Sequence, residues 1–145
     1  MTILQSEIAV GSEQYQQNRD ALLSQIAEVR AVQQKGIDKS YAAKPKFDKK
    51  GKILPHERVR LLLDADSPFV ELCGLVGYSM HDDKDGSEAG GGIIAGIGFV
   101  SGVRALVTAS NSAIKGGTMS PMGVQKTIRL QEIALENKLP VITLT

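Results

Sequence analysis

Cysteine, histidine and tryptophan are nearly missing from this chain of 145 residues. Cys73 is the only cysteine, so no disulfide can form within the chain and a reducing cytoplasm is the expected compartment. The two histidines, His56 and His81, have no second metal ligand at a recognisable spacing, which argues against a zinc site. Neither histidine neighbours a plausible nucleophile, so a serine–histidine–aspartate set is not expected. We therefore predict no metal site and no catalytic side chain in these residues.

The chain also lacks an excess of either charge and any long hydrophobic run. The 17 basic and 16 acidic residues leave a net charge of +1, which gives no electrostatic reason to expect nucleic acid or a membrane surface as a partner. No apolar run approaches the roughly 20 residues that cross a bilayer. The start of the chain has no basic segment followed by an apolar one, and it is not rich in arginine. We expect a cytoplasmic protein without a secretory signal or a mitochondrial transit peptide.

The first third of the sequence predicts a helix followed by a basic connection. Apolar residues recur at helical spacing from Ser12 to about Gln34, and Gly36 is expected to end this helix. Residues 37–54 carry six lysines against two aspartates and include a proline and a glycine. This composition predicts a solvated, mobile linker. The alternative is a basic patch that receives a phosphate or a partner surface.

Short elements are expected next. A helix begins at Leu54-Pro55 with proline in its first turn, and a short strand spans residues 69–72. Residues 81–88 form an acidic polar loop. The alternative for this loop is a calcium site, against which the absence of the EF-hand pattern with its distant glutamate argues. The three carboxylates concerned are Asp82, Asp83 and Asp85.

The last third predicts a β-hairpin and a βαβ unit. Residues 92–100 and 103–109 are rich in β-formers and are separated by Ser101-Gly102, which suits a tight turn. Ser120-Pro121 is expected to begin a helix that runs to Asn137, and an apolar run over 139–145 follows. This order demands a parallel sheet with a right-handed crossover. A buried parallel strand needs neighbours on both sides, so we expect the fold to continue beyond the last residue.

Two glycine-containing motifs come close to known nucleotide-binding fingerprints without matching them. Gly96, Gly98 and Gly102 deviate by one residue from the dinucleotide fingerprint, and they lie in a hairpin instead of between a strand and a helix. Residues 115–118, Lys-Gly-Gly-Thr, place the lysine before the glycines, so a P-loop is not expected. Cys73 follows a strand without a basic neighbour, which favours a buried, inert thiol over a nucleophile.

The polar loop from Ser110 to Pro121 is the best candidate for a binding site. Its two adjacent glycines would let backbone N–H groups converge, and the helix that Ser120 caps would place its positive dipole end beside them. Lys115 adds a cation. This combination suits an anionic segment of a ligand, such as the phosphate-bearing arm of a cofactor. The alternative is a structural loop that only turns the chain into the helix.

Several motifs follow one another in a recognisable order along residues 12–145. They are Lys52-x-Leu54-Pro55-x-Glu57-Arg58-Val59-x-x-Leu62-Leu63-Asp64, Ser67-Pro68-Phe69-x-Glu71-Leu72, Gly90-Gly91-Gly92-Ile93-x-x-Gly96-Ile97-Gly98-x-Val100-x-Gly102, Lys115-Gly116-Gly117-Thr118-x-x-Pro121-Met122 and Gln131-Glu132-Ile133-Ala134-x-x-Asn137-x-Leu139-Pro140. With these motifs the chain resembles the carboxyltransferase subunits of biotin-dependent acyl-CoA carboxylases. The similarity is greatest to the methylcrotonyl-CoA and geranyl-CoA carboxylase branch.

This resemblance implies an α/β, crotonase-like β-β-α spiral. The chain would contain the N-terminal half of this spiral, which is incomplete, preceded by an N-terminal helix. It further implies a helical extension over 1–36, a basic linker over 37–54 and a truncated carboxyltransferase domain over 55–145. The implied acyl-CoA-binding residues come from one loop. They are Ser110, Asn111, Lys115, Gly116, Gly117 and Thr118.

The resemblance also implies an activity. Family members transfer a carboxyl group from carboxybiotin to an acyl-CoA, and backbone N–H groups stabilise the enolate. The segment with these N–H groups would follow Thr145, so we assign no catalytic residue and expect the 145 residues alone to be inactive. No cofactor would be bound covalently, because a biotin carboxylase or biotin carrier subunit would supply the carboxybiotin. Homo-oligomers are implied. The alternative is a non-catalytic acyl-CoA-binding or subunit-docking domain.

Overall fold

A computed structural model describes residues 6–80 and 83–145, so His81 and Asp82 lie outside the described residues. The chain divides into two compact units, residues 1–31 and 32–145. In the described part of the first unit, helix α1 (Glu13–Ala42) begins where the Oγ atom of Ser12 accepts a hydrogen bond from the Tyr15 N–H at 3.2 Å. The apolar side chains of Leu22, Leu23 and Val29 are exposed along this part of α1.

The end of α1 differs from the prediction. Gly36 does not end the helix, which continues for six further residues to Ala42. Tertiary contacts explain the continuation, because the Ser40 side chain is fully buried and the Lys39 side chain is bonded to Ser87 and Glu88. These contacts outweigh the low helix propensity of one glycine.

The basic segment of residues 37–54 is largely helical. After α1, the short helix α2 (Lys44–Asp48) carries Pro45 in its first turn, where the missing N–H costs nothing. Gly51 then turns the chain with a φ of 61°. The mobility of this segment and the domain boundaries at residues 36 and 54 stay predictions.

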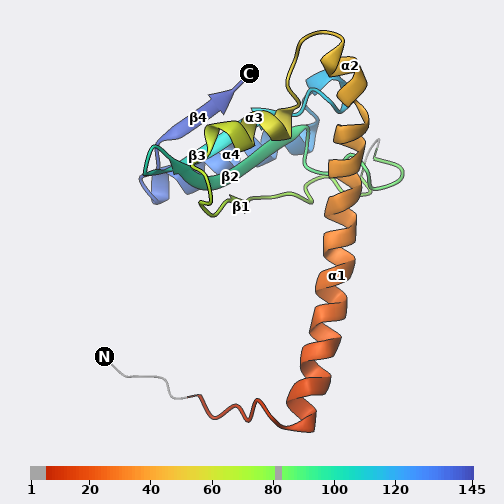
Figure 1. The fold of residues 1–145 in the computed structure, drawn as a ribbon, viewed down its shortest axis with the longest axis vertical. Coiled ribbons are helices and arrows are strands. Elements are labelled where there is room, and N and C mark those ends of the chain that lie inside the picture. The colour runs from red at the N-terminus through yellow and green to blue at the C-terminus, as the bar shows by residue number, and fades with distance from the viewer. Residues whose placement is uncertain (1–5, 81–82) are drawn as a thin grey trace. The chain divides into compact units, whose positions relative to one another are not determined.

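The predicted hairpin and βαβ unit are both confirmed. Strand β1 (Val70–Glu71) pairs antiparallel with β2 (Ile93–Val100), and β2 pairs antiparallel with β3 (Val103–Ser110). Helix α4 (Pro121–Glu136) then leads to β4 (Val141–Leu144), which is parallel to β3. Figure 1 shows the four strands side by side in the order β1-β2-β3-β4.

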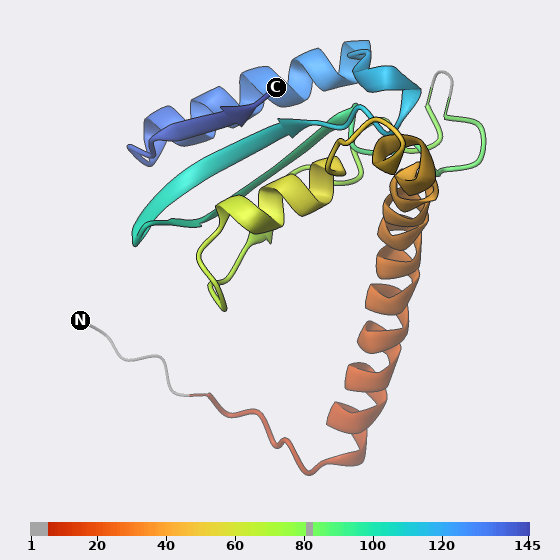
Figure 2. The same ribbon diagram turned by 45° about the horizontal axis from the view of Figure 1, so that its top comes forward.

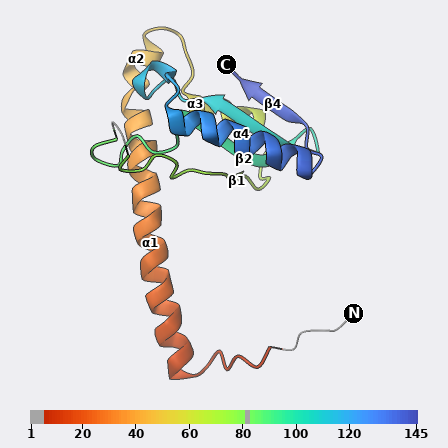
Figure 3. The ribbon, with the colours of Figure 1, turned by 180° about the vertical axis from the view of Figure 1, so that it is seen from behind.

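Two helices cover opposite faces of this sheet (Figure 2). Helix α3 (Pro55–Leu62) places Val59 against Ile94 and Val107 on one face. On the other face, which Figure 3 presents toward the viewer, α4 packs Leu130 against Leu106. Because neighbouring residues of a strand point to opposite faces, Leu106 and Val107 supply one residue to each core.

The turn between β2 and β3 is fixed by a residue that follows α3. Ser101 and Gly102 both have positive φ, 51° and 75°, as a tight hairpin turn requires. The Asp64 carboxylate accepts a hydrogen bond from each of their N–H groups, both at 2.7 Å. The α3 segment is thereby tied to the far end of the hairpin. In the part of the chain that the structure describes, no helix has the length and apolar character needed to cross a bilayer.

Candidate functional site

The candidate site is built where a glycine turn meets the start of α4. Gly90, Gly91 and Gly92 all have positive φ, between 65° and 103°. A Cβ atom at Gly91 would lie 2.7 Å from the Cα atom of Gly123 in α4, and one at Gly92 would lie 2.9 Å from the Thr118 carbonyl oxygen. Only glycine allows this approach of backbone to backbone.

A buried lysine fastens the same turn to α4. Lys126 is only 2% exposed, and its Nζ atom donates hydrogen bonds to the carbonyl oxygens of Gly90 at 3.2 Å and Ile93 at 2.6 Å. Burial lowers the pKa of Lys126 from its ordinary value, and the nearby Glu71 carboxylate partly opposes this. Sequence reasoning missed this residue, because a lysine on an amphipathic helix normally faces solvent.

The predicted helix start is confirmed, and the loop before it is closed on itself. The Oγ atom of Ser120 accepts a hydrogen bond from the Gly123 N–H at 3.1 Å, as an N-cap does. The N–H groups of Gly117 and Thr118 donate to the carbonyl oxygens of Ile114 and Lys115. These two N–H groups are therefore engaged within the loop instead of converging on a ligand.

Lys115 faces a carboxylate. Its Nζ atom forms an ion pair with Glu88, whose carboxylate also pairs with Lys39 of α1 at 2.6 Å. Burial disfavours the charged Glu88, but hydrogen bonds from Lys115 and Lys39 outweigh this and hold the pKa of the carboxyl group below its ordinary value. Glu88 therefore stays ionised and shares its charge between two lysines from separate segments.

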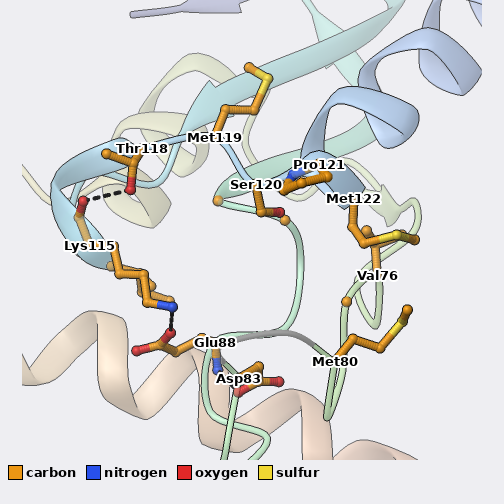
Figure 4. A pocket seen from close by; sticks show the side chains of 14 residues that line it. Val76, Met80, Asp83, Glu88, Lys115, Thr118, Met119, Ser120, Pro121 and Met122 are labelled. Atoms are coloured by element: carbon orange, nitrogen blue, oxygen red, sulfur yellow. Dashed lines mark hydrogen bonds and ion pairs between the residues drawn. The ribbon is translucent and has the colours of Figure 1, made fainter.

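A cavity of about 210 Å³ lies between the glycine turn, the Lys115 loop and the start of α4. Lys115 and Glu88 form one wall, and Met80, Met122 and Val76 lie across from them (Figure 4). Ile114, Met119 and Pro121 also belong to the apolar lining. The cavity thus combines a charged wall with flexible thioether side chains, which adapt to apolar groups of different shape.

The six residues predicted to bind a ligand do not share one cavity. Lys115 and Thr118 line the cavity described above. Asn111 and Ser110 line separate hollows, beneath α1 and beside α4 respectively. Gly116 lines a groove toward α2, and a Cβ atom at Gly117 would lie 3.3 Å from the Ser112 Cα atom. These neighbours in sequence therefore face different spaces.

Asn111 belongs to a buried polar network. Its Oδ1 atom accepts a hydrogen bond from the Ser40 hydroxyl at 3.2 Å, and the Ser40 Oγ atom also lies 3.2 Å from His56 Nδ1. The His56 ring stacks on Tyr41 with centroids 6.1 Å apart. Burial lowers the pKa of His56 from its ordinary value, so the imidazole is neutral at pH 7. Because the Ser40 hydroxyl donates to Asn111, a neutral His56 donates its Nδ1–H to Ser40.

Of the other candidates from the sequence, Asp83 lines the cavity described above, whereas Cys73 and Asp85 do not. Cys73 is exposed, so the prediction of a buried thiol is wrong; it lies in a turn after β1 with a φ of 54°. The Asp83 carboxylate accepts hydrogen bonds from the N–H groups of Ser79 and Glu88, and Asp85 accepts from Ser87. Within residues 6–80 and 83–145, no three metal-binding side chains are gathered.

Known proteins match both the sequence and the fold. Residues 46–145 match the family of the carboxyl transferase domain. The chain is 36% identical to the probable mitochondrial methylcrotonoyl-CoA carboxylase beta chain of Drosophila melanogaster, over 98% of this chain and 24% of that protein. It is 47% identical to a biotin-dependent 3-methylcrotonyl-coenzyme A carboxylase beta1 subunit of Mycobacterium tuberculosis, over 70% of this chain and 19% of that subunit.

A solved structure agrees. The beta subunit of geranyl-CoA carboxylase from P. aeruginosa superimposes with a TM-score of 0.88 at 57% identity, over 98% of this chain and 26% of that one. The predicted crotonase-like α/β fold is thereby confirmed. The chain spans about a quarter or less of the length of these relatives.

Proposed function

Since this chain belongs to the family of the carboxyl transferase domain, we propose that it forms the acyl-CoA-binding part of an acyl-CoA carboxylase beta subunit. The whole subunit would move a carboxyl group from carboxybiotin to an acyl-CoA of the methylcrotonyl-CoA type. A biotin carboxylase or biotin carrier subunit would supply the carboxybiotin. The relatives are methylcrotonoyl-CoA and geranyl-CoA carboxylase beta subunits, which supports this branch of substrates.

The cavity beside Lys115 is the observation that carries the proposal. An acyl-CoA joins an apolar acyl group to a chain that bears phosphates. The cavity offers both kinds of surface, since the thioethers of Met80, Met119 and Met122 and the Lys115 ammonium group all line it. Methionine adapts to branched and to extended apolar groups, which suits the acyl chains of this family.

We propose different tasks for the six loop residues that the sequence singled out. Lys115 and Thr118 would contact the ligand, because both line the cavity. Gly116 and Gly117, with φ of 68° and 83°, would give the loop its left-handed turn. Asn111 would position the loop through Ser40, as its 6% exposure supports. Ser110, at the end of β3, would set where the loop leaves the sheet.

Kinetics of the intact carboxylase test this assignment. Lys115→Ala should raise the KM for methylcrotonyl-CoA about fivefold, since a screened contact between a lysine and a phosphate contributes about 1 kcal/mol. Gly117→Val should impair the binding of methylcrotonyl-CoA more than Lys115→Ala does, because valine is strained at positive φ. Lys35→Ala removes an exposed lysine of α1 outside the cavity and should leave KM unchanged. If Lys115→Ala and Gly117→Val both melt like the wild type and keep its KM and kcat, the loop has only a structural role.

The non-catalytic docking role also has an observation in its favour. Val124, Ile128 and Leu135 are spaced along one face of α4, and their side chains are 47%, 54% and 81% exposed. An apolar face on an amphipathic helix supports packing against another polypeptide. We propose further copies of the subunit as the partner and a cytoplasmic location for the assembly. Sedimentation tests this contact. A Leu135→Glu variant is expected to dissociate, and Glu132→Gln on the same helix serves as the control.

A further inference from the structure

A groove of about 430 Å³ lies next to the cavity, between α2 and the loop that follows β3. All charged residues in its lining are lysines. Four lysines line it, three from α2 and the turn after it and one from the loop: Lys46, Lys50, Lys52 and Lys115.

The lysines of the basic segment divide into two groups. Lys39 pairs with Glu88, and Lys44 pairs with Asp48 at 3.2 Å and with Glu57 at 3.8 Å. In contrast, no carboxylate among the described residues pairs with the three groove lysines of this segment. The groove therefore carries positive charge that the chain itself leaves uncompensated.

Backbone hydrogen bonds hold these lysines in place. The N–H groups of Lys50 and Lys52 both donate to the Phe47 carbonyl oxygen, at 2.9 and 3.0 Å, and the Gly51 N–H donates to Asp48 at 3.0 Å. The cations thus lie on a closed turn, which lowers the entropy lost when they bind an anion. Phe47 also lines the groove and adds an aromatic surface of the kind on which bases stack.

We propose that this groove binds the phosphate groups in the nucleotide part of coenzyme A. The inference rests on the proposed function and extends it, since it assigns the phosphates to Lys46, Lys50 and Lys52. Lys115 lines both the groove and the apolar cavity, so one ligand can reach from the thioether side chains to the lysines. The Lys115 charge is already shared with Glu88, whereas the other three lysines are available to a multiply charged phosphate.

A small phosphate-bearing ligand explains the groove better than an acidic protein surface. The groove is concave, and the Lys49 side chain on the same turn is not part of its lining although it is equally exposed. A protein surface would contact Lys49 together with its neighbours. Lys49 therefore provides a matched control of identical charge.

Equilibrium binding to the intact carboxylase tests the inference, with coenzyme A as the probe. The triple variant K46Q/K50Q/K52Q should weaken coenzyme A binding about tenfold, because each screened contact contributes a factor of about two to five. Lys49→Gln should have no effect, and binding of pantetheine, which lacks the nucleotide, should be unchanged in both. Dephospho-coenzyme A shows which phosphate is bound. If the triple variant loses as much affinity for dephospho-coenzyme A as for coenzyme A, the lysines bind the diphosphate. If it loses less, they bind the 3′-phosphate.

Other outcomes overturn the inference. If the triple variant binds coenzyme A like the wild type, the lysines do not hold its phosphates, while the proposed function stands. The inference also fails if carboxyl transfer from the biotin carrier slows at unchanged coenzyme A affinity, since the lysines then contact a partner protein. If Lys49→Gln weakens coenzyme A binding as much as the triple variant does, the effect comes from the overall positive charge and not from the groove. Failure of the folded wild type to bind coenzyme A would remove the proposed function as well.

Discussion

Gly91 and Gly123 pack backbone against backbone, so that a Cβ atom at Gly91 would lie 2.7 Å from the Cα atom of Gly123. We expect Gly123→Ala to lower the free energy of unfolding by about 1–3 kcal/mol, because the added methyl group would overlap the Gly91 carbonyl group. A thermal melt measures the loss. An unchanged melting temperature would mean that α4 can shift away from the glycine turn without cost.

Gly36→Ala is the matched substitution with the opposite expected sign. Gly36 also lies within a helix, but its added Cβ atom would meet only ordinary contacts, at 3.7 Å from the Ser87 carbonyl oxygen. We expect stabilisation by about 0.5–1 kcal/mol from higher helix propensity, which raises the melting temperature by about 3 °C. A lower melting temperature would indicate that α1 does end near Gly36 in solution, with glycine needed there.

Lys126→Met should destabilise the chain although it replaces a buried charge with an apolar side chain of similar length. The substitution removes the Lys126 donor from the carbonyl oxygens of Gly90 and Ile93. The Gly90 oxygen still accepts a hydrogen bond from the Ile93 N–H, so the cost of about 1–3 kcal/mol for a buried carbonyl group without its donor falls on Ile93. Denaturant unfolding gives the difference. Lys138→Met, on an exposed residue after α4, serves as the control. A Lys126→Met variant as stable as the wild type would show that these carbonyl groups find other donors.

Asp64→Asn should weaken the β2–β3 hairpin. The two carboxylate oxygens accept from Ser101 and Gly102, and an asparagine would turn its NH₂ group toward one of these donors. We expect a loss of about 1–2 kcal/mol and faster amide exchange at the turn. Asp66→Asn makes the same change of charge two residues later and should be neutral. Equal exchange rates in both variants would contradict the assignment.

His56 should make the stability fall in mild acid. Its folded-state pKa lies below the unfolded value of 6.5, so below pH 6.5 the unfolded chain binds a proton that the folded chain does not. The contribution is complete above pH 6.5 and decreases as the pH falls toward the lowered pKa, by at most about 1.4 kcal/mol per pH unit. His56→Gln should lose less stability than the wild type between pH 7.5 and 5.5. Parallel losses would exclude His56 as the cause.

Much of the sheet follows from local patterns in the sequence. The hairpin turn at Ser101-Gly102 and the cap at Ser120 were predictable, because each depends on residues adjacent in sequence. The extension of α1 past Gly36 was not predictable, since it depends on contacts of Lys39 and Ser40 with residues about 16 to 71 positions away.

The candidate site was predictable only in part. The Lys115 loop was recognisable from its glycines and from the helix start that follows it. Its pairing with Glu88 was not, because sequence does not reveal which carboxylate of the acidic loop turns inward. The division of the lysines near residue 50 into paired and unpaired ones depends in the same way on the turn after α2.

Glu88 makes the two lysines that contact it energetically interdependent. When either Lys39 or Lys115 is removed, the remaining lysine becomes the only cation, among the residues that the structure describes, that pairs with this largely buried carboxylate. Its own removal then costs more than it did before. The two ion pairs are therefore non-additive, and a double-mutant cycle of Lys39→Met and Lys115→Met has a coupling energy different from zero. Through the Glu88 carboxylate, the electrostatic energy of the C-terminal turn of α1 is therefore coupled to that of the loop after β3.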